Sequence, residues 1–125
     1  MQKKFSQLYC FVDEYNYSKL CLLKQNIHII YRNYKKNPDT STLISLKNFC
    51  KLNKKKLFIS NNLKMALKFK LDGIYIPAFN DKINYINHNI PINFDIIGSA
   101  HNLREIKIKQ KQGCKAIFLC PIFRV

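Results

Sequence analysis

The chain has 125 residues, 47% of them hydrophobic, and a formal net charge of +15. This length supports one hydrophobic core and excludes a complete (β/α)₈ barrel, which needs about 200 to 250 residues. The positive charge comes from 19 lysines and 3 arginines. Nucleic-acid readers depend on arginine, and here scattered lysines dominate, so we expect a solvated basic surface and no nucleic-acid partner.

The cysteines and the first residues indicate the cellular compartment of the protein. The five cysteines include no CxxC pair, and their odd number argues against a disulfide framework. The basic first residues precede an apolar run too short for a signal sequence, and no run approaches the roughly 18 apolar residues of a membrane span. We therefore expect a cytoplasmic protein with no membrane partner.

Short apolar runs recur along the chain with helix-like segments between them, which is typical of a parallel α/β sheet. The runs predict six strands: Leu8 to Val12, His28 to Tyr31, Leu57 to Ser60, Gly73 to Ile76, Phe94 to Gly98, and Ala116 to Leu119.

The segments between the strands carry helix signals. Asp39 or Thr40 can cap a helix whose apolar residues Leu43, Leu46 and Cys50 fall on one face. A second helix is predicted by the spacing of Leu63, Ala66, Leu67 and Leu71.

A third helix begins near Leu103 and Ile106, and Gly113 can end it in the left-handed conformation. Within it, Glu105 and Lys109 have the spacing of an exposed i,i+4 ion pair.

Glycine distinguishes between the two folds that a series of βα units allows, an open doubly wound sheet and a closed barrel. The only glycines are Gly73, Gly98 and Gly113, so the chain has neither a GxGxxG motif nor a P-loop. We therefore expect an α/β fold, an incomplete TIM (β/α)₈ barrel with about six parallel βα units. Functional side chains should follow the carboxyl ends of its strands.

Five fragments carry a resemblance to a known family. IIYRNYKK, LFISNN, ALKFKLDGIYIP, IIGSAHN and AIFLCPIF occur in this order. Together they resemble the thiamine phosphate synthase and TenI family of barrels. The resemblance covers residues 1–125 as one domain, truncated at its C-terminal end. It implies transfer of a hydroxymethylpyrimidine group from its pyrophosphate to a thiazole phosphate, so that the partners are small pyrimidine and thiazole phosphates.

The resemblance also implies phosphate-binding residues. Arg32 matches the arginine of the family's Gln-x-Arg-x-Lys strand, and Lys35 or Lys36 stands near its lysine, although Ile30 and Tyr34 occupy the glutamine and lysine positions. Asn61 matches the asparagine of the family's Asn-Asp pair, which contacts pyrophosphate.

The metal positions depart from the family pattern. Asn62 replaces the first Mg²⁺ carboxylate and Asn80 the second, while Asp81 lies next to the latter. Because Mg²⁺ prefers anionic oxygen ligands, a site at Asn62 and Asp81 would be weak.

Ser99 and His101 match the family's Ser-x-His motif, which implies that Ser99 binds substrate. In TenI-like thiazole tautomerases the matching histidine is the general acid and base, a role that suits a side chain with an ordinary pKa near neutrality. This gives His101 a catalytic role without a metal. The alternatives are a solvated histidine that caps the following helix, and a protein that binds a phosphate ligand without catalysis.

The sequence stops where the family continues with two more strands. We expect a fragment of a longer protein, inactive at this length, or a degenerate copy stabilised as a homo-oligomer.

Overall fold

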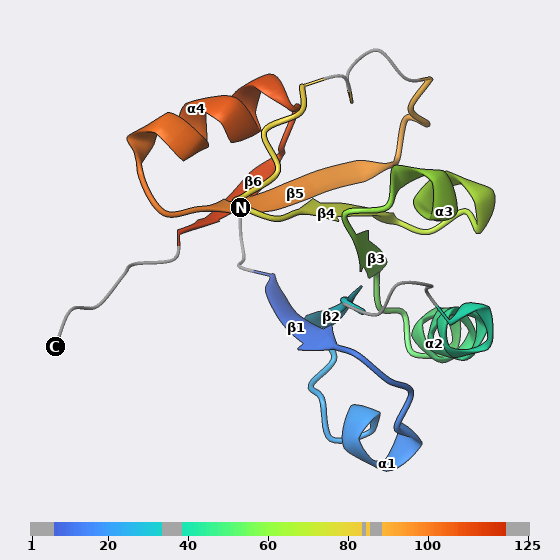
Figure 1. The fold of residues 1–125 in the computed structure, drawn as a ribbon. Helices are drawn as coiled ribbons and strands as arrows, with labels where there is room; N and C mark the ends of the chain where they lie inside the picture. Colours follow the sequence, from blue (N-terminus) through green and yellow to red (C-terminus); the bar gives the residue numbers. More distant parts are fainter. Residues whose placement is uncertain (1–6, 34–38, 84, 86–88, 120–125) are drawn as a thin grey trace, which may run out of the picture. The chain divides into compact units, whose positions relative to one another are not determined.

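The structure, a computed structural model, describes residues 7–33, 39–83, 85 and 89–119 (Figure 1). The chain forms two compact units, Met1–Phe58 and Ile59–Val125. The strand β3 (Leu57–Ser60) runs from the end of unit 1 into unit 2.

The described residues of unit 1 form two parallel strands and two helices. The strand β1 (Leu8–Val12) is followed by α1 (Tyr17–Leu20), β2 (Ile27–Tyr31) and α2 (Thr40–Leu52). β1 pairs in parallel with β2, with Cys10 opposite Ile29.

The helix α2 begins where its sequence predicts. Asp39 is the N-cap, and its carboxylate accepts hydrogen bonds from the backbone N–H groups of Ser41 and Thr42 at 3.0 and 3.4 Å. Leu43 and Leu46 are fully buried, as their spacing predicted. Burial of each such leucine contributes about 1.5 to 3 kcal/mol.

Besides the end of β3, the described residues of unit 2 form three parallel strands and two helices. After α3 (Leu63–Lys68) come β4 (Gly73–Ile76), β5 (Asp95–Ala100), α4 (Leu103–Lys111) and β6 (Ala116–Leu119). β5 lies between β4 and β6 and pairs in parallel with both. Gly113 has φ 91° after α4, which confirms the predicted left-handed stop.

The six strands follow the sheet order β1-β2-β3-β4-β5-β6, which is their order in the chain. Parallel strands in chain order, most of them followed by a helix, confirm the α/β prediction and are consistent with an incomplete TIM-like barrel. In the part of the chain that the structure describes, no helix is long and apolar enough to cross a membrane.

The structure differs from the sequence prediction in three places. The sequence prediction assigned no residues to a helix where α1 lies, and β5 runs from Asp95 to Ala100 instead of from Phe94 to Gly98. The described residues between β4 and β5, which are 77–83, 85 and 89–94, contain no α-helix, although a crossover helix was expected.

Lys109 also differs from its prediction. It is completely buried, and its ammonium group donates to the backbone oxygen of Asn80 at 2.8 Å, so it is not an exposed partner of Glu105. The lysine lies on the face of α4 that packs over β5: a β-carbon built on Gly98 would lie 2.8 Å from Lys109 Cδ.

Candidate functional site

His101 is the first residue after β5 and is paired with a carboxylate. Its Nδ1 lies 3.1 Å from Oε1 of Glu105, and its backbone N–H donates to the same oxygen at 2.7 Å. These hydrogen bonds, the backbone one first, lower the pKa of Glu105, so its carboxylate is ionised at neutral pH. An ionised carboxylate favours the tautomer in which Nδ1 carries the proton and Nε2 is an acceptor.

The start of α4 fixes this pair. Asn102 is the N-cap, and its side-chain oxygen accepts from the backbone N–H of Glu105 at 2.9 Å. The capping function therefore belongs to Asn102, and His101 lies one residue before the cap. The imidazole is 39% exposed, which leaves the ring accessible from solvent.

Ser99 lies inside β5 and is buried, with 4% of its surface exposed. Its hydroxyl shares a 2.6 Å hydrogen bond with the hydroxyl of Tyr75 on β4. The Tyr75 ring stacks on Phe118 of β6, with 6.1 Å between ring centroids and 23° between planes. Three neighbouring strands thus contribute a hydroxyl pair and an aromatic stack to one face of the sheet.

Asn61 follows β3 with φ 59°, a left-handed conformation that asparagine tolerates better than most residues. Its backbone N–H donates to the backbone oxygen of Tyr75 at 2.7 Å. Its side-chain oxygen accepts from Nδ2 of Asn80 at 2.5 Å, and the same Nδ2 donates to the hydroxyl of Tyr85 at 2.7 Å. The asparagines that follow β3 and β4 are therefore in direct contact.

Burial raises the pKa of Tyr85. The phenol therefore stays neutral over the physiological range, and the network formed by Asn61, Asn80 and Tyr85 contains no charged side chain.

The two predicted metal positions hold a helix cap and an exposed carboxylate. The Asn62 side chain is the N-cap of α3 and accepts from the backbone N–H of Met65 at 3.0 Å. Asp81 is exposed on the loop after β4. Within the described ranges, no group of three His, Cys, Asp or Glu side chains could hold a metal ion.

Arg32 belongs to unit 1. Its backbone N–H donates to the Val12 oxygen at 2.8 Å, and its guanidinium carbon lies 4.1 Å from the centroid of the Phe11 ring. This stacking orients the guanidinium near the carboxyl end of β1. Lys35, the other predicted phosphate ligand, lies outside the described residues.

Sequence reasoning missed Glu105, Tyr85 and Gln112 as parts of this region. Gln112 is completely buried, and its Nε2 donates to the backbone oxygens of Asn80 and Lys82 at 2.8 and 2.7 Å. Lys109 and Gln112 therefore tie the loop after β4 to α4. Glu105 could have been found from the sequence, because a glutamate three residues after an N-cap asparagine has capping-box spacing.

Comparison with known proteins gives no family assignment. No protein-family model matches the chain, and no curated protein matches it.

Proposed function

We propose that this chain carries a metal-independent proton-transfer site of the TenI-like thiazole tautomerase type, with His101 as the general acid and base. The observation that carries the proposal is the contact between His101 Nδ1 and the ionised Glu105 carboxylate. A carboxylate on one ring nitrogen leaves the other nitrogen ready to accept a proton from a ligand.

The proton cycle follows from this pair. Nε2 removes a proton from the thiazole ligand, and the imidazolium so formed faces the Glu105 carboxylate at 3.1 Å. The imidazolium then returns the proton to another atom of the same ligand, so that the reaction needs no oxidant or metal. Glu105 is a positioning residue, since it acts through the imidazole.

The phosphate of the ligand would be bound by polar groups at strand ends. In unit 2, Asn61 supplies an amide and Ser99 a hydroxyl for this contact. Phosphorylated small molecules and cysteines without a CxxC pair favour a cytoplasmic setting for this activity.

The transferase function that the family resemblance also implies has less support. That reaction uses Mg²⁺, and amides occupy both carboxylate positions. Asn62 caps α3, and the Asn80 amide group donates to Asn61 and Tyr85. The Asn80 side chain therefore presents N–H donors to its neighbours, whereas a Mg²⁺ ligand must present an oxygen lone pair.

The test is proton exchange in D₂O, followed by NMR on a thiazole phosphate incubated with the full chain in EDTA. We expect exchange that His101→Asn slows by about 10² to 10³, because a positioned general base contributes 10²- to 10⁴-fold. Glu105→Gln should slow it about tenfold, since the imidazolium loses a neighbouring anion. The control is Lys107→Ala, an exposed position on the same helix.

Two other outcomes would support the transferase or the non-catalytic binding protein instead. Coupling of a pyrimidine pyrophosphate to the thiazole phosphate that requires Mg²⁺ and survives His101→Asn would establish the transferase and refute the tautomerase. Saturable phosphate-ligand binding with no exchange would leave a binding protein without catalysis.

A further inference from the structure

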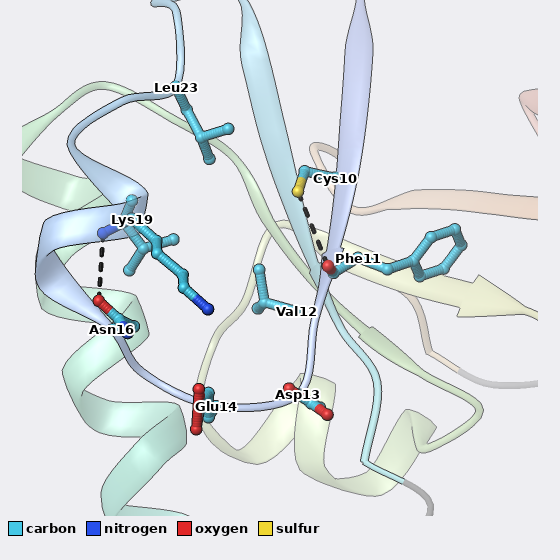
Figure 2. A pocket seen from close by; sticks show the side chains of 9 residues that line it. Cys10, Phe11, Val12, Asp13, Glu14, Asn16, Lys19 and Leu23 are labelled. Carbon is cyan, nitrogen blue, oxygen red and sulfur yellow. Dashed lines mark hydrogen bonds between the residues drawn. The ribbon is translucent and has the colours of Figure 1, made fainter.

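A cavity of about 270 Å³ lies at the carboxyl end of β1 and is built only from residues of unit 1 (Figure 2). One wall is β1, and the other is α1 with the turn after it. The lining residues are Cys10, Phe11, Val12, Asp13, Glu14, Asn16, Lys19, Leu20 and Leu23. None of them belongs to the site proposed for proton transfer.

The inner wall of the cavity is apolar. Side chains alternate along a strand, so Cys10 and Val12 face the cavity while the Phe11 ring points to the other face of β1, as Figure 2 shows. Leu20, which is buried, and Leu23 complete the wall from the side of α1. This surface suits an aliphatic group of a ligand.

The rim of the cavity carries charges of both signs. Asp13 and Glu14 follow β1 directly, and the Lys19 side chain extends from α1 into the space between helix and strand (Figure 2). In the described part of the chain, no hydrogen bond or ion pair engages these two carboxylates or this ammonium group. These charged groups line the cavity and are not paired with one another.

The Asn16 amide adds a donor beside Lys19. Its oxygen accepts from the backbone N–H of Lys19 at 3.1 Å, which fixes the side chain and leaves its NH₂ group on the other side of the amide. An ammonium and an amide NH₂ at one part of the rim are a donor set for a carboxylate.

We propose that this cavity binds a small zwitterion with an aliphatic group, of the α-amino acid class. The ligand's ammonium pairs with Asp13 and Glu14, and its carboxylate pairs with Lys19 and Asn16. Its aliphatic group lies against Val12, Leu20 and Leu23.

Size and charge both select this class. The cavity of about 270 Å³ is at the small end of ligand-binding cavities, which suits a ligand the size of an aliphatic amino acid. A phosphate would face two carboxylates, and a simple amine would leave Lys19 opposite a like charge. Only a ligand with both charges matches the whole rim.

The experiment is an NMR titration of the ¹⁵N-labelled full chain with L-leucine, recording the amide signals of Val12, Asn16 and Lys19. We expect saturable shifts with a dissociation constant on the order of 1 mM, typical of so small a ligand. 4-Methylpentanoic acid lacks the ammonium and 3-methylbutylamine lacks the carboxylate. Each should bind at least about tenfold more weakly, since it loses one charge-assisted contact.

Two exposed positions test the assignment of charges. Lys19→Met should weaken leucine binding about tenfold without weakening the binding of 3-methylbutylamine, and Glu14→Gln should weaken both. Lys24→Met is the matched control, an exposed lysine near α1 that does not line the cavity. These side chains are exposed, so the variants should fold, and circular dichroism verifies this.

Three results would overturn the proposal. These are the absence of saturable shifts up to about 50 mM leucine, fifty times the expected constant; binding of either single-charge analogue as tightly as leucine; and loss of affinity in Lys24→Met equal to that in Lys19→Met. None of them bears on the proton-transfer proposal, which rests on residues of unit 2.

Discussion

Gly98→Ala tests the close packing of α4 over β5. A β-carbon at this position would lie 2.8 Å from the backbone oxygen of Ile76, 2.8 Å from Lys109 Cδ and 3.1 Å from Cys114 Sγ. The lysine stem can shift, but the Ile76 oxygen cannot, because Ile76 is paired with Gly98 in the parallel register of β4 and β5. The methyl group must therefore push the two strands apart or distort them.

The magnitude combines two opposing effects. Overpacking of this kind costs about 1 to 3 kcal/mol, and replacing glycine by alanine returns about 0.4 to 1 kcal/mol by restricting the unfolded chain. We expect a net loss of about 1 to 2 kcal/mol in the free energy of unfolding. For a chain of this length that corresponds to a Tm lower by roughly 4 to 8 °C.

Urea denaturation followed by circular dichroism measures this loss, with Lys111→Ala on the exposed face of α4 as the control. The double variant Gly98→Ala, Lys109→Ala separates the two contacts. If the Ile76 oxygen decides the cost, Gly98→Ala remains destabilising when Lys109 is already alanine. A Gly98→Ala protein as stable as the parent would refute the packing argument.

Three further predictions concern buried and half-buried polar groups of unit 2. Burial lowers the pKa of Lys109 below its ordinary 10.5, so the unfolded chain binds more protons and Lys109 should make stability rise as pH increases toward 10.5. Lys109→Met should reduce that rise in urea midpoints measured across the range. Burial raises the pKa of the Cys114 thiol to about 11, so its alkylation by iodoacetamide at pH 8, resolved by mass spectrometry, should be about 100-fold slower than that of an ordinary thiol. Rapid labelling would contradict its burial. Asn80→Asp removes the NH₂ group that donates to Asn61 and Tyr85, and it should lower the free energy of unfolding by about 1 to 3 kcal/mol. Urea denaturation should give the same loss in EDTA as in Mg²⁺ buffer. Recovery of stability with Mg²⁺ would show that a metal site forms there.

The strands were predictable because continuous apolar runs are a local property of the sequence. Leu8–Val12 and Leu57–Ser60 formed with the predicted bounds. β5 was predicted too short because Ser99 and Ala100 have little strand preference of their own. Their strand conformation comes from pairing with Phe118 and Leu119 of β6, a tertiary effect.

The helices show the same division between local and tertiary information. The cap of α2 at Asp39 depends on its immediate neighbours and was predictable. α1 has four residues, too few to show a period. Lys109 was misplaced because a lysine is ordinarily solvated. Only the space over Gly98 and the carbonyl of Asn80 explain its burial.

The contacts of the candidate site also separate into local ones and tertiary ones. His101 and Glu105 are four residues apart at a helix start, so their contact follows from local geometry once Asn102 is recognised as the cap. The contact of Asn61 with Asn80 joins residues 19 apart in sequence, and that of Tyr75 with Ser99 joins residues 24 apart. Such pairs depend on how the strands align, which a single sequence does not specify.

The hydrogen bonds of the Asn80 amide restrict the conformation of the loop after β4. Nδ2 donates to two oxygens while Oδ1 accepts from the backbone N–H of Lys82 at 3.0 Å, so rotating the amide by half a turn would break the hydrogen bonds with Asn61 and Lys82. The group has one orientation, and neither it nor its amide partner titrates. The hydrogen bonds of this amide should therefore persist from acidic to neutral solution, a range in which the Tyr85 phenol stays protonated.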